Sequence, residues 1–299
     1  MTNGLPERTA EWLSSALGPT ARIHEIAVLS DTSHTNHRLR VQAPGGAEVE
    51  LLLRGYTDGE LLASDPWYSP ADEVAALRAL ESTDLPVPRV VAADVGGDMC
   101  DVPTLLLTWL PGHPPDTSDD LDAFVHHLAE PLPTIHAVDA PNSMRIYESY
   151  VVSDGIDVRD LQPPAWAFDV RTWERAFELV AQDPPPVRER FIHRDYHHGN
   201  TVWREGRLTG IVDWTTGCVG SPMIDVAHAR MNLAWDFDLE TADAFLEAGR
   251  GLEPDLDIDP YWEVLDAVDG LLSERWSDAD PETLRRYETY VTRVLADLD

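Results

Sequence analysis

The chain has 299 residues, of which 43% are hydrophobic, so it is long and apolar enough to bury a sizeable core. Its 54 acidic residues against 22 basic ones give a formal net charge of -32, which argues against nucleic acid or an anionic membrane as a partner. Every basic residue is an arginine, so the lysine that often binds phosphate is absent.

Two cysteines, Cys100 and Cys218, are too few for a disulfide framework, and a reducing cytoplasm is the expected location. The first residues lack the basic and apolar segments of a signal peptide. No stretch approaches the roughly 18 apolar residues that a membrane-spanning helix needs. We therefore expect a cytoplasmic protein with no membrane partner.

The first third of the chain predicts a small β-sheet with one helix. Short runs rich in Val, Leu and Ile predict strands over residues 22–29, 36–43, 48–55, 89–94 and 103–110. A Pro-Gly-Gly sequence at 44–46 predicts a hairpin turn between two of these strands. Ser69 suits an N-cap and Pro70 suits the first helical position, so residues 69–83 predict a helix.

Beyond the loop at 111–116 the pattern becomes mostly helical. Apolar residues at helical spacing predict helices over residues 120–138, 166–182, 225–235, 241–251, 260–276 and 281–298. Residues 200–214 are the exception, because they predict two short strands around the turn Glu205–Gly206. We expect an α+β fold with a small antiparallel-sheet domain at residues 1–109 and a larger, mainly helical domain at residues 110–299.

A charged cluster, FIHRDYHHGN at 191–200, precedes the predicted hairpin, and IVDW follows at 211–214. A hairpin that turns at 205–206 would place Asn200 close to Asp213 across the two strands. Hard oxygen ligands of this kind are those that Mg²⁺ prefers. Asp195 would then lie near the ion as a carboxylate that accepts a hydroxyl proton, an arrangement used for phosphoryl transfer from a nucleotide.

Two other interpretations of the cluster stay open at this point. The residues His193, His197 and His198 could form a zinc site, although no water-activating geometry is evident from the sequence. An ordinary polar turn would explain one or two of the charged residues, but not the second aspartate at the end of a paired strand.

Three motifs carry a resemblance to a known family. They are HRDYHHGN at 193–200, VDW at 212–214 and GSPMIDVA at 220–227. In this order they are similar to those of the aminoglycoside phosphotransferase and choline kinase-like family, relatives of the protein kinases. The resemblance implies a protein-kinase-like fold with two lobes, and it covers about residues 20 to 250.

The resemblance also implies roles for individual residues. Asp195 would be the catalytic base or the group that orients the hydroxyl, and Asn200 and Asp213 would bind Mg²⁺. His193 would brace the loop, and Asp225 would hold the loop backbone from the following helix.

In the smaller lobe the resemblance implies a nucleotide site. Arg54 would occupy the position of the phosphate-binding lysine, with Glu73 as its ion-pair partner, although the helix dipole alone also favours an acidic residue there. The turn at 30–36 would cover the nucleotide, and because it has no glycine, Ser33 and Thr35 could supply hydroxyls; a plain polar hairpin is the alternative. The segment containing Thr108 and Leu110 resembles the hinge that meets the base.

Acidic residues in the later helices suggest a cationic acceptor. They are Asp236, Asp238, Glu240, Glu263, Asp266 and Asp269, interleaved with Trp235, Tyr261 and Trp262. Carboxylates with aromatic walls suit a polyamine sugar or a quaternary amine, and Asp236, Glu263 and Asp266 are the candidate substrate ligands. A solvated acidic helix face would explain the same residues.

The leading hypothesis is an O-phosphotransferase that uses Mg²⁺ and ATP or GTP, acting on an aminoglycoside-like antibiotic and therefore conferring antibiotic resistance. A metabolic kinase of choline, homoserine or a similar small alcohol needs the same motifs. A pseudokinase that binds nucleotide without catalysis is the third hypothesis, because the lysine is absent and Arg194 stands where the family usually has glycine.

Overall fold

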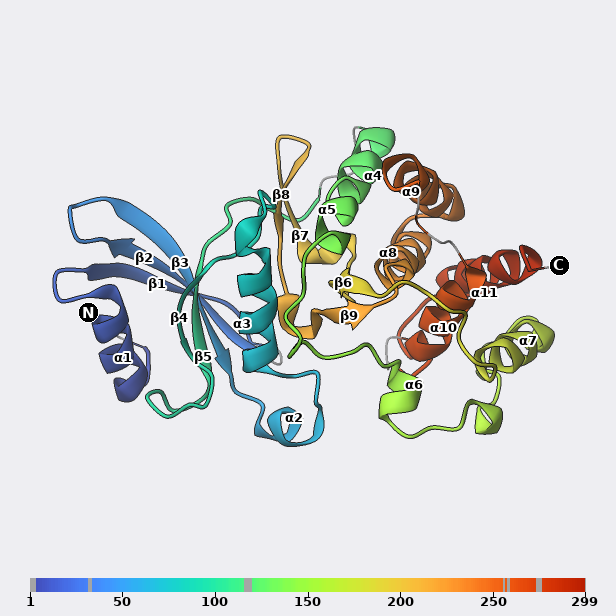
Figure 1. The fold of residues 1–299 in the computed structure, drawn as a ribbon, viewed down its shortest axis with the longest axis horizontal. Coiled ribbons are helices and arrows are strands. Elements are labelled where there is room, and N and C mark those ends of the chain that lie inside the picture. The colour runs from blue at the N-terminus through green and yellow to red at the C-terminus, as the bar shows by residue number, and fades with distance from the viewer. Residues whose placement is uncertain are drawn as a thin grey trace. The chain divides into compact units, whose positions relative to one another are not determined.

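The structure is a computed structural model that describes residues 4–31, 34–115, 120–254, 256, 259–272 and 276–298 (Figure 1). It divides into two compact units. The sheet unit comprises Met1–Gly112 and Thr209–Thr216, and the helical unit comprises His113–Leu208 and Gly217–Asp299. The segment 209–216, which carries Asp213, therefore belongs with the N-terminal residues although it lies far along the chain. The domain boundary predicted at 109/110 stays a prediction.

The sheet unit is built on a five-stranded sheet with the order β1-β2-β3-β5-β4, in which all neighbours are antiparallel. Its elements are α1 (Glu7–Leu17), β1 (Arg22–Asp31), β2 (His34–Gln42), β3 (Glu48–Tyr56), α2 (Gly59–Ser64), α3 (Pro70–Ala79), η1 (Leu80–Ser82), β4 (Val90–Asp94), β5 (Thr104–Thr108) and η4 (Trp214–Thr216). Apolar residues of β2 and β3, among them Leu39 and Leu53, pack in one buried cluster with Trp12 and Leu13 of α1. The amphipathic helix α1 therefore covers a sheet face that would otherwise meet water.

Helix α3 begins as its sequence predicts. The side chain of Ser69 accepts a hydrogen bond from the Asp72 backbone N–H, and Pro70 occupies the first turn. Val74 and Leu77 are buried, and the helix packs against η4 within the same unit. This packing fixes the orientation of the helix face that carries Glu73.

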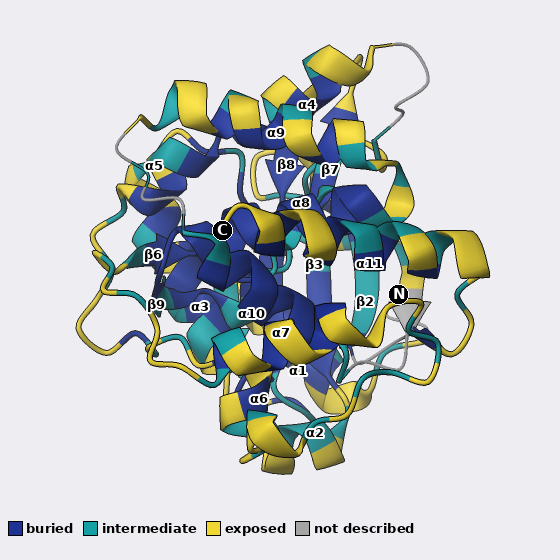
Figure 2. Cartoon of the chain, turned by 90° about the vertical axis from the view of Figure 1, so that its right-hand side faces the viewer, coloured by how far each residue is buried: buried dark blue, intermediate teal, exposed yellow. Residues whose placement is uncertain are grey.

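The helical unit holds the remaining elements. They are α4 (Leu121–Ala129), α5 (Leu132–His136), α6 (Tyr150–Ser153), η2 (Val158–Asp160), α7 (Val170–Val180), β6 (Arg190–Ile192), η3 (His198–Asn200), β7 (Thr201–Arg204), β9 (Cys218–Gly220), α8 (Met223–Asp236), α9 (Leu239–Leu252), α10 (Pro260–Gly270) and α11 (Pro281–Ala296), while β8 (Arg207–Ile211) begins in this unit and ends in the sheet unit. Helix α8 packs against α9, α10 and α11, and α10 is largely buried (Figure 2). A helix that is buried around most of its surface lies in the core of its unit.

The structure corrects several element predictions. The helix predicted over 120–138 is two helices, α4 and α5, because prolines at 131 and 133 interrupt the hydrogen bonds of a continuous helix. Helix α10 ends at Gly270, earlier than predicted. The acidic residues Glu263, Asp266 and Asp269 of this helix are buried, so a solvated acidic face is the wrong interpretation for them.

The predicted hairpin is present as β7 and β8. Its turn residues Glu205 and Gly206 have φ angles of 53° and 72°, as a tight two-residue hairpin turn requires. The strands stop at Thr201 and Ile211, so Asn200 and Asp213 each lie just outside them. Among the described residues, no helix is both long and apolar enough to cross a membrane.

Candidate active site

The loop that carries Asp195 is anchored by a short strand pair in the helical unit. Phe191 and Ile192 of β6 are buried and pair with Val219 and Cys218 of β9. The loop that follows presents the Asp195 side chain with 41% of its surface exposed. A half-exposed carboxylate on a rigidly anchored loop can meet a bound substrate.

Both carboxylate oxygens of Asp195 are held. Nδ2 of Asn200 donates to Oδ2 at 2.7 Å, and Nε2 of His228 lies 2.9 Å from Oδ1. Nδ2 of Asn200 also donates to the backbone oxygen of Asp195 at 3.0 Å. Burial opposes the charge of Asp195, but the hydrogen bond from His228 and the neighbouring imidazoles outweigh it and hold the pKa of this carboxyl well below its usual range.

Asp225, at the start of α8, fixes the backbone of the same loop. Its Oδ2 accepts from the His193 backbone N–H at 3.0 Å, and its Oδ1 accepts from the Arg194 backbone N–H at 2.7 Å. The structure thus brings together the two residues for which a supporting role is expected, His193 and Asp225, both with no exposed surface. His136 of α5 lies 3.2 Å from Oδ2 of Asp225 and 2.8 Å from Oε2 of Glu253.

Arg194 adopts a backbone conformation that glycine adopts more easily, with φ at 71°. Its guanidinium lies 4.3 Å from the centre of the Tyr150 ring, and its Nη2 donates to the Glu148 backbone oxygen at 3.0 Å. A left-handed backbone costs a non-glycine residue roughly 1–2 kcal/mol, and the cation–π contact and the backbone hydrogen bond of the guanidinium each offset about 0.5–1 kcal/mol of it. The arginine side chain therefore stabilises a backbone conformation that glycine adopts more easily.

In the part of the chain that the structure describes, the histidines of the alternative zinc interpretation, His193, His197 and His198, do not form one group of candidate ligands. Among the described residues, the group whose ligand atoms all lie within 4.8 Å of one another is Asp195, His197 and His228. Burial lowers the pKa of His197 to about 4. Burial also opposes the charge of His228, but the carboxylates of Asp266 and Asp195 outweigh it and raise the pKa of His228 to about 10.

The sheet unit holds the other candidate residues in a second cluster. Nη1 of Arg54 lies 2.8 Å from Oε1 of Glu73 and 2.9 Å from Oδ1 of Asp213, and its Nε donates to Oδ1 of Asn36 at 3.2 Å. The Tyr56 hydroxyl donates to Oε2 of Glu73 at 2.5 Å. Burial disfavours the charged guanidinium, but the carboxylates of Glu73 and Asp213 outweigh it and raise the pKa of Arg54. The arginine predicted to replace a lysine is therefore a buried cation with two carboxylate partners.

The remaining residues predicted to contact the nucleotide are Thr35, Ser33, Thr108 and Leu110. The Thr35 hydroxyl donates to the Gly55 backbone oxygen at 3.4 Å, and Ser33 lies outside the described residues. Thr108, at the end of β5, accepts at Oγ1 from the Arg89 backbone N–H at 2.8 Å. Leu110 is half-buried.

The three candidate substrate ligands differ in their surroundings. Asp236 is 45% exposed and lies 3.1 Å from Nε2 of His198. Asp266 lies 3.1 Å from Nδ1 of His228 and is mostly buried. Glu263 is buried and bonded to Arg230 and to the Tyr290 hydroxyl, so its carboxylate is used inside the unit and the structure does not bring it to Asp195.

Sequence reasoning missed His228, His136 and Arg230. His228 could have been found from spacing, because it follows Asp225 by three positions and residues three apart share a helix face. His136 and Arg230 acquire their partners through tertiary packing, which no local pattern of the sequence indicates.

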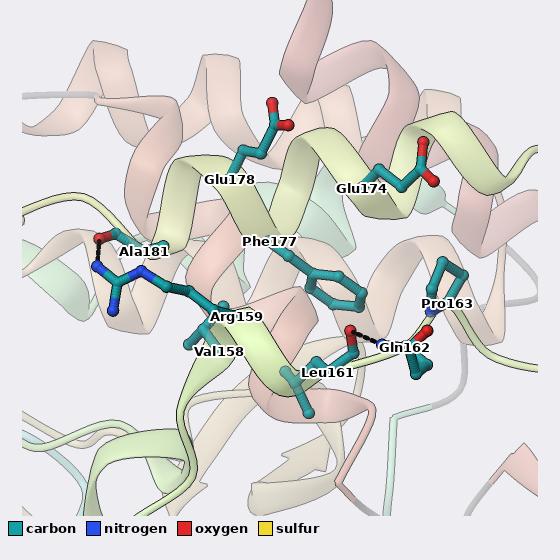
Figure 3. A pocket seen from close by; sticks show the side chains of 9 residues that line it. All are labelled: Val158, Arg159, Leu161, Gln162, Pro163, Glu174, Phe177, Glu178 and Ala181. Carbon is teal, nitrogen blue, oxygen red and sulfur yellow. Dashed lines mark hydrogen bonds between the residues drawn. The ribbon is translucent and has the colours of Figure 1, made fainter.

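The helical unit also has a cavity of about 730 Å³, and none of these residues lines it (Figure 3). It is lined by Val158, Arg159, Leu161, Gln162, Pro163, Glu174, Phe177, Glu178 and Ala181. The carboxylates of Glu174 and Glu178 point away from the Phe177 ring in Figure 3 and converge on no common point. This cavity lacks the convergent polar groups of a reaction site.

The chain is similar to phosphotransferases both in its sequence and in its fold. A sequence model of the phosphotransferase enzyme family matches residues 34–268. The solved structure of aminoglycoside phosphotransferase APH(4)-Ia in a ternary complex with ADP and hygromycin B is similar with a TM-score of 0.63, at 16% identity, over 96% of this chain and 97% of that chain. The streptomycin–ATP–APH(2")-IIa ternary complex is similar with a TM-score of 0.59, at 16% identity, over 93% of this chain and 90% of that chain.

A curated relative is the Arabidopsis thaliana protein named probable acyl-CoA dehydrogenase IBR3, which is 22% identical over 233 residues. The match covers 69% of this chain but only 28% of that relative's length. Identities at this level to the solved structures show the fold, and the family match covers most of the chain. The chain therefore belongs to the phosphotransferase enzyme family, and the family and the protein-kinase-like fold expected from its motifs are confirmed.

Proposed function

We propose that the chain transfers the γ-phosphoryl group of ATP or GTP to a hydroxyl of a small, cationic molecule resembling an aminoglycoside. The observation that carries the proposal is the half-exposed Asp195 carboxylate, held at both oxygens on a loop whose backbone Asp225 fixes. A carboxylate in this state can accept the hydrogen bond of an acceptor hydroxyl and align its oxygen with the phosphorus. Catalysis of phosphoryl transfer consists mainly of such positioning and of charge neutralisation.

Arg54 is the proposed partner of the nucleotide phosphates, with Glu73 as the residue that holds it in place. The buried Arg54–Glu73 pair supports this role, because it fixes a permanent positive charge at the end of β3. Thr35 and Ser33, from the turn, and the backbone at Thr108 and Leu110 remain proposed contacts of the nucleotide.

Asn200 and Asp213 are the proposed ligands of Mg²⁺, and the atoms that they leave available fit this ion. The described hydrogen bonds of the Asn200 amide are donated by Nδ2 to Asp195, so its Oδ1 is the ligand atom. The described hydrogen bonds of the Asp213 carboxylate reach Oδ1, so its Oδ2 is the ligand atom. Both are hard oxygens, and a bound Mg²⁺ would neutralise charge on the phosphates.

The acceptor is proposed to be cationic for two reasons. The chain carries a net charge of -32, and two of the similar solved structures are complexes with hygromycin B and with streptomycin. Asp236 is the strongest of the three predicted acceptor contacts because it is the most exposed, and Asp266 is next. Glu263 is not part of the proposal, since Arg230 and Tyr290 use its carboxylate.

A metabolic kinase of choline, homoserine or a similar small alcohol is the second candidate. One observation favours it: Asp266 is paired with His228 and Glu263 with Arg230, so two of the three predicted carboxylates have a cationic partner inside the protein and less negative charge remains for an acceptor with several amines. The experiment that decides is a mass-spectrometric screen of aminoglycosides and small alcohols, with ATP or GTP and Mg²⁺, for the added mass of one phosphoryl group.

Phosphorylation of an aminoglycoside supports the first candidate, and phosphorylation of a small alcohol alone supports the second. Nucleotide binding without transfer to any acceptor would support the pseudokinase hypothesis instead. For the first candidate we also propose a cytoplasmic location and a role in antibiotic resistance. The resistance role predicts that expression of the protein raises the aminoglycoside concentration needed to inhibit the growth of a susceptible bacterium.

A further inference from the structure

We infer that His228 and Asp266 act as a positioning pair for Asp195. This inference rests on the proposed function and deepens it, because it names the groups that orient the carboxylate facing the acceptor hydroxyl. Nε2 of His228 lies 2.9 Å from Oδ1 of Asp195, and Nδ1 of the same ring lies 3.1 Å from Oδ1 of Asp266. The three side chains form one continuous line of hydrogen bonds.

The pair complements the contact from Asn200. Asn200 reaches Oδ2 of Asp195 and His228 reaches Oδ1, so the plane of the carboxylate is held from two sides. A carboxylate held at one oxygen can still rotate about its last bond, whereas one held at both oxygens cannot. The free lone pairs of Asp195 therefore keep one direction, toward the acceptor.

The His228 ring donates from both nitrogens. It lies between two carboxylates, and no acceptor capacity remains on a ring that carries two N–H groups. The other imidazole close to it is that of His197, whose ring centre is 5.6 Å away and whose pKa is lowered. His228 is therefore a fixed cationic donor and does not remove the hydroxyl proton itself.

Helix geometry explains how this pair reaches the loop. Asp225 and His228 are three residues apart on α8, so one face of this helix fixes both the loop backbone and the Asp195 side chain. Asp266 comes from α10, which packs directly against α8. The packing of these two buried helices thus sets the orientation of the carboxylate.

A bound transition metal is the alternative use of the same atoms, since Asp195, His197 and His228 bring their ligand atoms within 4.8 Å of one another. The hydrogen bond of His197 argues against it. Its Nδ1 accepts from the Gly199 backbone N–H at 3.1 Å, which places the ring proton on Nε2, the atom that faces Asp195. A protonated Nε2 offers no lone pair to an ion.

The test compares His228→Leu, which removes the donor, with His228→Gln, which keeps an N–H donor of similar reach. Loss of a hydrogen bond to a charged group predicts that His228→Leu lowers kcat by about 10- to 100-fold, with the KM for nucleotide changed by less than about 3-fold. His228→Gln and Asp266→Asn are expected to keep more activity than His228→Leu and Asp266→Ala. The exposed residues His126 and Asp84 provide the matched controls His126→Gln and Asp84→Asn.

Two results would overturn the inference while leaving the proposed function intact. In the first, a folded His228→Leu variant has the kcat of the wild type, while the Asp195→Asn variant is inactive. The other is equal losses in the Leu and Gln variants with a matching fall in Tm, which would show a purely structural role. If Asp195→Asn itself stays fully active, the proposed function fails first.

A measurement independent of activity keeps the inference testable for any acceptor. Crystal structures of the wild type and of His228→Leu are expected to show a rotated Asp195 carboxylate in the variant, and an unchanged carboxylate contradicts the positioning role. Stoichiometric zinc that survives dialysis of the wild type and is lost in His228→Leu would overturn the inference in favour of the metal site.

Discussion

In the loop that carries Asp195, an unfavourable backbone conformation is offset by side-chain contacts, and Arg194 is the clearest example. Its φ of 71° is unfavourable, and its stacked guanidinium and the bond to the Glu148 backbone oxygen offset that cost. The sequence indicated that position 194 departs from the family pattern. It could not show the compensation, because the aromatic partner Tyr150 lies in a different element, α6.

Substitution at this position separates strain from contact. Arg194→Ala keeps the unfavourable φ and loses the contacts, so we expect the free energy of unfolding to fall by about 2 kcal/mol. Arg194→Gly also loses the contacts but adopts a positive φ freely, and it should be about 1 kcal/mol more stable than Arg194→Ala. Urea denaturation measures both, with the exposed Arg171→Ala as control. An alanine variant at least as stable as the glycine variant would contradict the account.

Arg54 offers a second test at the scale of one residue. Its Nη1 alone contacts both Glu73 and Asp213, and a lysine ammonium could replace that one nitrogen. We therefore expect Arg54→Lys to bind Mg²⁺–nucleotide within a few-fold of wild type, whereas Arg54→Met should bind about 10- to 100-fold more weakly. Calorimetric titration measures both, with the exposed Arg78→Met of α3 as control. Undiminished binding by a folded Arg54→Met variant would place the phosphates elsewhere.

Secondary-structure elements were predictable where local signals agree. The cap at Ser69, the Gly206 turn and the regular apolar spacing of α11 lie in the sequence itself, and the structure has these elements at or close to the predicted residues. Predictions were wrong where a helix-breaking residue interrupts a long segment with apolar residues at helical spacing, as at the prolines that separate α4 from α5. Burial of Glu263 and Asp266 in α10 was also missed, because their partners Arg230 and His228 come from α8.

Three helical elements meet at His136, and this junction predicts a dependence of stability on pH. Burial opposes the charge of His136, but Asp225 of α8 and Glu253 at the end of α9 outweigh it and raise its pKa to about 9. A histidine whose pKa is higher in the folded state contributes stability below its unfolded value near 6.5, and loses that contribution as the pH rises through 9.

The expected contribution is on the order of 3 kcal/mol, because each pKa unit corresponds to about 1.4 kcal/mol. The free energy of unfolding of the wild type should fall between these two pH values. In His136→Gln the fall should be smaller by this amount, although the variant is less stable at low pH. Urea denaturation across the pH series measures the difference, and parallel curves would contradict the assignment. His228 titrates in the same direction in both proteins, so it cancels in the comparison.

At the scale of the whole molecule, the chain order of the motifs predicted the family, and the family match confirms it. The assignment of residues 209–216 to the sheet unit was not predictable from composition, because a short segment joins a distant unit only through tertiary contacts. The candidate acceptor contacts were the least predictable part. The net charge of the sequence predicts a negatively charged surface, but the ion pairs of Asp236, Glu263 and Asp266 depend on packing.

The central claim is that Asp195 orients the acceptor hydroxyl for phosphoryl transfer. The most direct test measures the turnover of Asp195→Asn, with ATP or GTP, Mg²⁺ and the acceptor found by the screen, beside wild type and the exposed-site control Asp84→Asn. We predict that Asp195→Asn loses turnover by about 100-fold or more and still binds Mg²⁺–nucleotide, whereas Asp84→Asn matches wild type. Turnover of a folded Asp195→Asn variant at the wild-type rate would contradict the claim.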